Sequence, residues 1–526
     1  MRRDLVLLFL VALLVRALAA APQTGPGYMD AAYYTLGAQR LAEGFGFREM
    51  VLWNYLDDPG GVPHPSHLYW MPLPSLLAAG PMALLGSSYH AAQVAFVLLS
   101  ALVPVLAYLV SWGLAPDRRR ALTTAGLALF SGYYVIYWGV PEAFAPFALA
   151  GAACLAATGL ALRDERAGWY LAAGAMAALG HLTRADGVLL LAPAALAVLV
   201  RLIRGPRRGA ALRGGALVLT AYLLVMAPWF WRNLQVAGQP LPTRGTAALW
   251  LRGYDELYSY GWVPSLQSYL AWGWANILNS KLEALRLNAL NFILANNLVF
   301  LLPFTLVGAW RLWRHALVWP ALVYGLGLYA AMTFAFTFPG MRGGTLHSSA
   351  ALLPAVFAVG VAGLDGSVAW LAQRRRGWRV AEAQAVFAAG AVLLAIGLSA
   401  WLYSARVLGA GGLADPDWNH AYDTYERAAA ELRTRGETAG LVMVNDPPAI
   451  TYLTGMPSAA VPNETLETVL AAAERYGVRY ILLDHNRPEP LAGEYAGTVS
   501  TPGMTEAFSF EDRAGRAVHV WRVEEK

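Results

Sequence analysis

Cysteine and charge are both scarce in this 526-residue sequence. The only cysteine, Cys154, lies in an apolar run, so the chain can form no internal disulfide and holds no cysteine-rich metal site. Charged residues make up 14% of the chain, whereas an ordinary soluble protein has about 25%. Hydrophobic residues make up 57%, and windows of about 20 apolar residues are typical of transmembrane helices. The composition therefore excludes a large soluble enzyme and predicts a polytopic membrane protein.

Apolar windows along the chain predict about eleven membrane spans. They lie near residues 4–21, 89–112, 121–139, 143–162, 168–184, 188–203, 214–231, 291–310, 316–337, 350–371 and 383–404. The first window follows the basic start MRRD, as in a signal peptide. We interpret it as an uncleaved helix because many more spans follow.

Arginines cluster in every second loop between these windows. The clusters are Arg2 and Arg3, Arg118 to Arg120, Arg163 and Arg166, Arg204 to Arg213, Arg311 and Arg314, and Arg374 to Arg379. Because short basic loops stay in the cytoplasm, this alternation predicts a cytoplasmic N-terminus. An odd number of spans then places the C-terminus outside. The net charge of +5 is explained by topology and does not indicate a nucleic-acid partner.

Three segments on the predicted outer side are long enough to carry function. They are the loops 22–88 and 232–290 and the tail 405–526. The tail has the pattern of a small α/β domain, with helices expected at 417–435 and 464–476, strands at 440–445 and 478–484, and a closing hairpin after them. It contains no glycine-rich phosphate loop, nucleophile elbow or metal-ligand cluster, so we expect a recognition or structural module. The chain is thus divided into a transmembrane domain, 1–404, and an extracytoplasmic domain, 405–526.

The first outer loop places one acid, Asp30, shortly after the end of the first span. Apolar residues recur on one face of a short helix over 30–44, and a second short helix is expected over 72–86. Short amphipathic helices beside a bilayer are typical of elements that lie in the membrane interface. Asp30 can act as the N-cap of the first helix, or it can do chemistry at the membrane surface. The two interpretations are compatible.

The same loop resembles the GT-C superfamily of membrane glycosyltransferases. Its pattern is D-x-x-Y-Y-x-x-x-A-x-x-L-x-x-G-x-G-F, followed by a histidine and P-L-x-x-L-L. The matching residues are Asp30, Tyr33, Tyr34, Ala38, Leu41, Gly44, Gly46, Phe47, His67, Pro72, Leu73, Leu76 and Leu77. The resemblance is to the branch with the protein O-mannosyltransferases and the lipid A aminoarabinose transferase, and in topology it covers about residues 1–400.

This resemblance implies an outward active site between the first loop and the helix bundle. It also implies a sugar donor linked to polyprenyl phosphate, and it implies that the acid of the first outer loop, here Asp30, is the catalytic base. The aromatic and histidine side chains of that loop are then expected to line the donor or acceptor cavity. They are Tyr33, Tyr34, His64, His67 and Tyr69.

Two other predicted outer turns carry charged candidates. Glu142, in YWGVPEAFAPF, is either a first-turn acid that complements the helix dipole or a second acid that faces Asp30. Arg184, in LTRADG, either pairs with Asp186 or meets the donor phosphate, as the family pattern implies. Charged residues close to a bilayer are costly and are functional candidates by default.

The turn FPGMRGGTLHSSAALLP holds Arg342 and His347. A guanidinium matches phosphate oxygens and neighbouring glycines allow close approach, so we expect both residues at the donor phosphate. The alternative is an ordinary interfacial arginine. His64 and His67, in HPSH, are a weak metal signal because no nearby acid completes a ligand set. We expect that no metal or other cofactor is required.

Together these observations predict an inverting glycosyltransferase of the cell membrane. It moves a hexosyl or related sugar from a polyprenyl-phosphate donor to an extracytoplasmic acceptor that is a protein, a lipid or a glycan. One alternative is a transporter or lipid-linked glycan flippase, in which polar groups lie at the bilayer midplane, often in internal repeats. Here the polar candidates lie at the outer ends of predicted spans. The other alternative is a structural membrane protein with an external binding domain.

Overall fold

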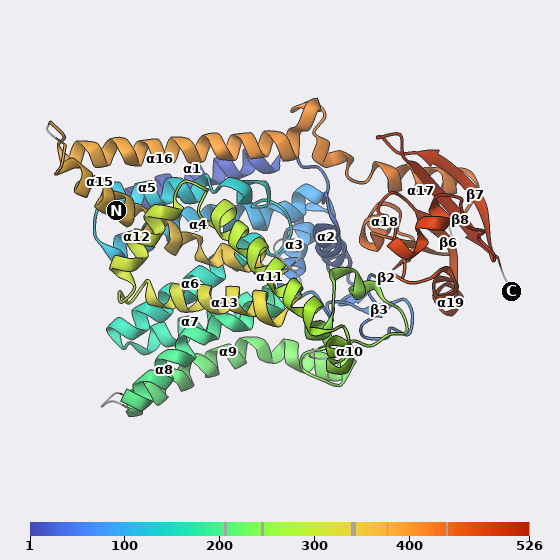
Figure 1. The fold of residues 1–526 in the computed structure, drawn as a ribbon, viewed down its shortest axis with the longest axis horizontal. Helices are drawn as coiled ribbons and strands as arrows, with labels where there is room; N and C mark the ends of the chain where they lie inside the picture. The colour runs from blue at the N-terminus through green and yellow to red at the C-terminus, as the bar shows by residue number, and fades with distance from the viewer. Residues whose placement is uncertain (205–207, 243–246, 338–342, 376, 438–439, 525–526) are drawn as a thin grey trace.

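The structure, a computed structural model, describes residues 1–526 except 205–207, 243–246, 338–342, 376, 438–439 and 525–526. Figure 1 shows a bundle of long helices and a smaller α/β part that lies at one end of it. The N-terminus and the turn between α15 (Leu353–Ala372) and α16 (Val380–Tyr403) lie at the opposite end of the bundle (Figure 1).

Six helical stretches among the described residues are long and apolar enough to cross a membrane. Three are the single helices α4 (Tyr89–Leu114), α6 (Phe144–Asp164) and α9 (Arg208–Ala237). Three join consecutive elements and cover Ala185–Arg204, Gly344–Ala372 and Val380–Gly411. Around them pack three further helices, α1 (Arg2–Ala20), α7 (Ala167–Thr183) and α13 (Trp319–Ala330).

The predicted span 121–139 is an interrupted helix. It contains α5 (Arg118–Leu129), which is followed by a 3-10 turn that begins at Gly132. Gly132 has a φ of 62°, a left-handed conformation that a helix does not continue through. A 12-residue helix is about 18 Å long, which is shorter than the hydrocarbon core of about 30 Å. The prediction of one uninterrupted span is wrong here.

The predicted span 291–310 is interrupted as well. A π-helical turn extends α11 (Trp274–Asn291), and the chain then breaks at Leu298 and Val299, with φ angles of 51° and 65°, before α12 (Leu302–Leu312) begins. Apolar composition does not reveal such breaks. The prediction of eleven continuous spans therefore exceeds what the described residues form.

The first outer loop forms two short helices that pack on each other, α2 (Met29–Ala42) and α3 (Leu73–Leu85). At Gly37 a Cβ atom would lie 2.8 Å from the Ser75 hydroxyl of α3, so a larger residue would push the two helices' side chains apart. Asp30 lies in the first turn of α2, after the N-cap residue Tyr28, and no side chain of the described residues caps this helix. The N-cap interpretation of Asp30 is therefore wrong.

The C-terminal part is a six-stranded sheet with helices packed on it. The strand order is β2-β5-β4-β6-β8-β7, with parallel pairs from β2 to β6 and antiparallel pairs from β6 to β7. Its strands are β4 (Leu441–Val444), β5 (Ser458–Ala460), β6 (Val478–Leu483), β7 (Met504–Glu511) and β8 (Ala517–Val523), and its main helices are α17 (Asp423–Thr434), α18 (Pro447–Thr454) and α19 (Leu466–Tyr476). β4, β6 and the closing hairpin lie where the sequence pattern predicts them.

One edge strand of this sheet comes from the first outer loop. β2 (Val51–Leu52) pairs in parallel with β5. Ala32, in α2, packs in the same apolar core as Ile450 of α18. The ion pair between Asp58 and Arg475, at 2.8 Å, adds a contact at the surface. The first loop and the C-terminal domain therefore form one packed unit, which holds α2 and Asp30 in place.

Candidate functional site

Three of the predicted site residues meet beside the C-terminal domain. Asp30 lies in the first turn of α2, Glu142 lies just before α6, and Arg184 lies between α7 and η2 (Ala185–Leu191). The Asp30 charge acts on Glu142, and the Arg184 charge acts on both acids. Helix α2 also packs on α18 of the C-terminal domain. Three segments far apart in the sequence thus form one charged site.

Glu142 is fully buried, with 0% of its surface exposed. The backbone amides after it lie nearby, yet among the described residues neither carboxylate oxygen makes a well-formed hydrogen bond. Burial raises the pKa of Glu142 and the neighbouring Asp30 raises it further, while Arg184 opposes the shift. Burial also raises the pKa of Asp30, by less, and Arg184 lowers it. Two neighbouring acids do not ionise together easily, and the larger upward shift of the pKa of Glu142 favours the negative charge on Asp30.

Arg184 is held by a second acid. Its Nε donates to Asp186 at 3.2 Å, and Asp186 also accepts a hydrogen bond from Ser348 at 2.5 Å. Gly344 leaves room for this acid, because a Cβ atom there would collide with the Asp186 carboxylate. Although burial opposes the charge, Asp186 and Glu142 raise the pKa of Arg184. The pairing considered from the sequence is present, and the same guanidinium also acts on Asp30 and Glu142.

His347 lies on the acid side of the site, in α14 (Gly344–Ser348). Its Nε2 is 3.5 Å from Oε1 of Glu142, and its ring stacks on Phe144 with the centroids 4.4 Å apart. One possible ligand atom from each of Asp30, Glu142 and His347 lies within 4.8 Å of the others. Imidazole nitrogens and carboxylate oxygens are common ligands of divalent cations, and the unbonded Glu142 oxygens fit such an ion. The absence of a required metal stays a prediction.

The charges of this site act on two of the three predicted tyrosines. Burial raises the pKa of Tyr34 and the Glu142 charge raises it further, so the Tyr34 hydroxyl lies near that acid. Burial also raises the pKa of Tyr69, and the charge of Arg184 counteracts the shift. The Tyr33 hydroxyl instead accepts a hydrogen bond from the backbone N–H of His67 at 2.7 Å. The charges of the site thus act on Tyr34 and Tyr69, whereas Tyr33 braces the loop.

His64 belongs to a separate cluster. Its Nδ1 lies 3.5 Å from Glu49 and its Nε2 lies 3.0 Å from Asp57. Burial opposes protonation, but Asp57 and Glu49 raise the pKa of His64 to about 9. The histidine is therefore a cation between two acids, with both ring nitrogens occupied. The sequence-based statement that no acid lies near it is wrong, because both acids come from more distant parts of the same loop.

His67 is a buried structural residue. Its two ring nitrogens lie 2.8 Å from Ser66 Oγ and 2.9 Å from Ser75 Oγ. Burial lowers the pKa of His67 to about 3, with a further effect of the Arg232 charge, so the ring stays neutral. It joins the loop to α3, and it shares no partner with His64 among the described residues. The two histidines do not form a metal site together.

Two further residues, Arg342 and Asp446, bear on the site. Arg342 lies in 338–342, outside the described residues, so its predicted contact with phosphate stays a prediction. Sequence reasoning missed Asp446, which it took for part of a turn. Asp446 is the N-cap of α18; burial raises its pKa, and the charge of Asp30 contributes to the shift. The DPP motif that follows a buried strand is the only sequence signal for such a helix start.

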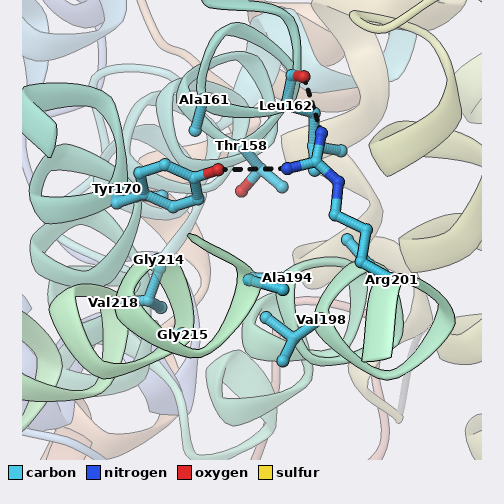
Figure 2. A pocket seen from close by; sticks show the side chains of 13 residues that line it. Thr158, Ala161, Leu162, Tyr170, Ala194, Val198, Arg201, Gly214, Gly215 and Val218 are labelled. Atoms are coloured by element: carbon cyan, nitrogen blue, oxygen red, sulfur yellow. Dashed lines mark hydrogen bonds between the residues drawn. The ribbon is translucent and has the colours of Figure 1, made fainter. Parts of the chain in front are cut away.

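A small cavity lies away from this site, between α6, α7, α8 (Ala192–Arg204) and α9 (Figure 2). Its walls are mostly apolar. Arg201 lies at its rim and donates to Tyr170 Oη at 3.4 Å and to the Leu162 carbonyl at 2.9 Å. The described residues that line the cavity include none from the Asp30 site, and the one charged side chain among them is already paired.

Comparisons with known proteins bear on this architecture. The family model for dolichyl-phosphate-mannose-protein mannosyltransferases matches residues 63–231. The comparison with curated protein sequences gives no match. The oligosaccharyltransferase AglB from Archaeoglobus fulgidus, in complex with an inhibitory peptide and a dolichol-phosphate, has a TM-score of 0.60 and 13% identity over 98% of this chain and 74% of its own. ArnT from Cupriavidus metallidurans, bound to undecaprenyl phosphate, has a TM-score of 0.54 and 14% identity over 98% and 97%.

At these identities the solved structures establish the fold. The family match includes Glu142 and Arg184 and begins after Asp30. The likeness to solved structures extends over nearly the whole chain, the C-terminal domain included. The chain therefore has the fold of these membrane enzymes, and its predicted resemblance to the GT-C superfamily, in the branch of the protein O-mannosyltransferases and the aminoarabinose transferase, is confirmed.

Proposed function

We propose that this chain is an inverting membrane glycosyltransferase that transfers a hexosyl or related sugar from a polyprenyl-phosphate donor to an extracytoplasmic acceptor. The observation that carries the proposal is the convergence of Asp30, Glu142 and Arg184 at one site, in which Glu142 is fully buried. The reaction needs one base and one cation together. The solved neighbours bind dolichol-phosphate and undecaprenyl phosphate, which supports a lipid-phosphate donor.

The acceptor hydroxyl attacks the anomeric carbon from the face opposite the lipid phosphate. A new carbon–oxygen bond forms while the bond to the phosphate oxygen breaks, which inverts the anomeric centre. Asp30 takes the proton of the acceptor hydroxyl, a contribution that is typically about 10²- to 10⁴-fold. The electron pair of the broken bond leaves with the phosphate, and Arg184 stabilises the growing negative charge. Such a fixed cation acts most strongly where water is excluded.

The site also has a place for a cation. Asp30, Glu142 and His347 would hold a divalent ion, which would supply additional positive charge beside the phosphate. Without such an ion, protonation of one acid would also balance the charges at this site. Burial raises the pKa of Glu142 and so favours its neutral form, and Arg184 then faces a single carboxylate at Asp30.

The arrangement of the bundle supports an outward-facing site. The N-terminus and the α15–α16 turn, where two arginine clusters occur in the sequence, lie at the end opposite the C-terminal domain (Figure 1). The rule that basic loops stay inside supports an extracytoplasmic position for Asp30 and for the C-terminal domain.

The direct test is transfer of radiolabel from a panel of polyprenyl-phosphate sugars in membranes that contain the protein. We expect the wild type to transfer label from at least one donor. Asp30→Asn should lower the rate by at least about 100-fold because it removes the base. Glu43→Gln is the matched control, since this acid ends the same helix at its far end. Full transfer by Asp30→Asn would contradict the assignment of Asp30 as the catalytic base. Absence of transfer from every donor by the wild type would favour a transporter or flippase.

A further inference from the structure

Polar side chains continue from Asp30 toward the C-terminal domain. Tyr28 precedes α2 and Tyr89 begins α4, while Tyr422 precedes α17 and Asp446 is the N-cap of α18. These four residues and Asp30 are called the junction cluster below. Two of its members come from the C-terminal domain, so the cluster exists only where the two parts of the molecule meet.

Packing places these side chains at one junction, since Tyr422 lies in the same apolar core as Ala32 of α2 and Ala449 of α18, and their charges act on one another. Burial raises the pKa of Tyr28, and charges at Glu142 and Asp30 raise it further. Burial also raises the pKa of Tyr422, and the charges of Asp446 and Tyr89 raise it further. Contacts between α2 and α18 bring the two halves of the cluster into place.

Three hydroxyls of the junction cluster lack a hydrogen-bond partner in the described part of the chain. They are Tyr28 Oη, Tyr89 Oη and Tyr422 Oη, and all three are buried. Tyr89 is only 4% exposed. Buried hydroxyls in folded proteins are almost always hydrogen-bonded, so each exception needs an explanation. A bound molecule that offers hydrogen-bond partners to these tyrosines supplies such an explanation.

Asp446 adds an acceptor from the other side. Its Oδ1 accepts the hydrogen bond of the Ala449 backbone N–H at 3.1 Å. A carboxylate has about four acceptor positions, so capping α18 leaves Asp446 able to accept from a ligand as well. The Asp446 carboxylate accepts hydrogen bonds, and the tyrosine hydroxyls both donate and accept them. The cluster therefore matches a molecule that carries several hydroxyl groups.

We infer that the junction cluster is the acceptor site of the proposed reaction and that it binds a polyhydroxylated acceptor such as the terminal sugar of a glycan. The inference rests on the proposed function. Hydroxyls on neighbouring carbons donate to Asp446, accept from Tyr28 and Tyr89, and leave one hydroxyl for Asp30 to deprotonate.

A peptide acceptor fits this place less well. A serine or threonine offers a single hydroxyl, and the rest of an extended peptide is usually bound by pairing with a free sheet edge. On this side the sheet of the C-terminal domain ends at β2, which is two residues long and comes from the chain's own first loop. The sheet therefore offers a peptide only a two-residue edge on this side.

The first experiment identifies the acceptor class. Purified protein in lipid nanodiscs receives a radiolabelled polyprenyl-phosphate sugar together with either methyl hexosides or a blocked Ala-Ser-Ala tripeptide, each at millimolar concentration. We expect label in the hexosides and not in the tripeptide. Label in the tripeptide alone would overturn the inference and leave the proposed function intact. Failure of the wild type to release sugar from any donor, even to water, would overturn both.

The second experiment tests the residues. Tyr89→Phe removes one hydroxyl, and Asp446→Asn removes the charge but keeps a good N-cap. We expect each variant to raise the KM for the hexoside by about tenfold, the effect of one lost hydrogen bond, with the KM for the donor unchanged. Tyr495→Phe is the matched control in the C-terminal domain, with a hydrogen bond to Ala517. Equal changes in both KM values, or none, would contradict the assignment.

Discussion

Two clusters in the outer part of the molecule each combine two acids with one histidine, and they differ in how well their polar atoms are satisfied. In the first, His64 lies between Glu49 and Asp57 and both of its ring nitrogens are paired. In the second, Glu142 is fully buried beside Asp30, and neither of its oxygens makes a well-formed hydrogen bond among the described residues.

Under the proposed function, this difference distinguishes a structural cluster around His64 from a chemical one around Asp30. A buried acid with few partners costs stability, and a fold keeps such a group where binding or chemistry uses it. In the second cluster an arginine, Arg184, acts on both acids. The His64 cluster instead holds the first loop together. The same residue types therefore have different roles, which their partners reveal.

The largest change in transfer rate is expected when the positive charge of Arg184 is removed. Arg184→Ala should lower kcat by about 10²- to 10³-fold, because the Arg184 guanidinium then no longer stabilises the leaving phosphate. Arg184→Lys keeps a charge and should retain more activity, which separates charge from packing. The measurement is transfer of label at saturating donor, with thermal unfolding as a check that both variants fold. An Arg184→Ala enzyme with the wild-type kcat would remove Arg184 from the site.

The next effect concerns stability. The pKa of His64 in the folded protein is raised to about 9 by Asp57 and Glu49, although burial opposes the shift, and an unfolded histidine has a pKa of about 6.5. The stabilisation is therefore complete below pH about 6.5 and is lost as the pH rises through about 9. His64→Gln should lower the free energy of unfolding by about 1–3 kcal/mol at neutral pH and remove this pH dependence.

Thermal unfolding as a function of pH provides the check, with transfer of label measured on the same samples. We expect the rate per folded molecule to be unchanged in His64→Gln. A variant with wild-type stability at every pH, or one that is stable but inactive, would show that the His64 cluster is not merely structural.

The smallest effect is expected at Glu142. Glu142→Gln replaces a neutral acid by an uncharged amide of the same shape, so the rate should fall by no more than about threefold, and a chelator should leave the wild type active. The assay is label transfer with and without a chelator. A large loss that added divalent cation restores would instead show that Asp30, Glu142 and His347 hold a required ion.

The sequence predicts part of this site for a clear physical reason. Asp30, Glu142 and Arg184 are charged residues in otherwise apolar surroundings, so the amino-acid pattern alone reveals their positions at helix ends. A helix near 30–44 and strands near 440–445 and 478–484 follow from periodicity. The family resemblance, rather than the residues themselves, singles out Asp30 as the base.

Other features leave no such signal. β2 is two residues long and cannot show an alternating pattern. The breaks at Gly132 and Leu298 lie within apolar runs, where composition looks continuous. The acids around His64, and Asp446 beside Asp30, are brought together by long-range packing. Contacts of this kind depend on the whole fold and not on spacing along the chain.

The most direct test of the central claim compares one acid from each cluster. Asp30→Asn and Asp57→Asn are the same chemical change in the same loop, and both are assayed for label transfer per folded molecule from a polyprenyl-phosphate sugar. We predict a loss of at least about 100-fold for Asp30→Asn, and for Asp57→Asn a lower unfolding temperature with a nearly unchanged rate. Equal losses in the two variants, or a larger loss for Asp57→Asn, would contradict the account.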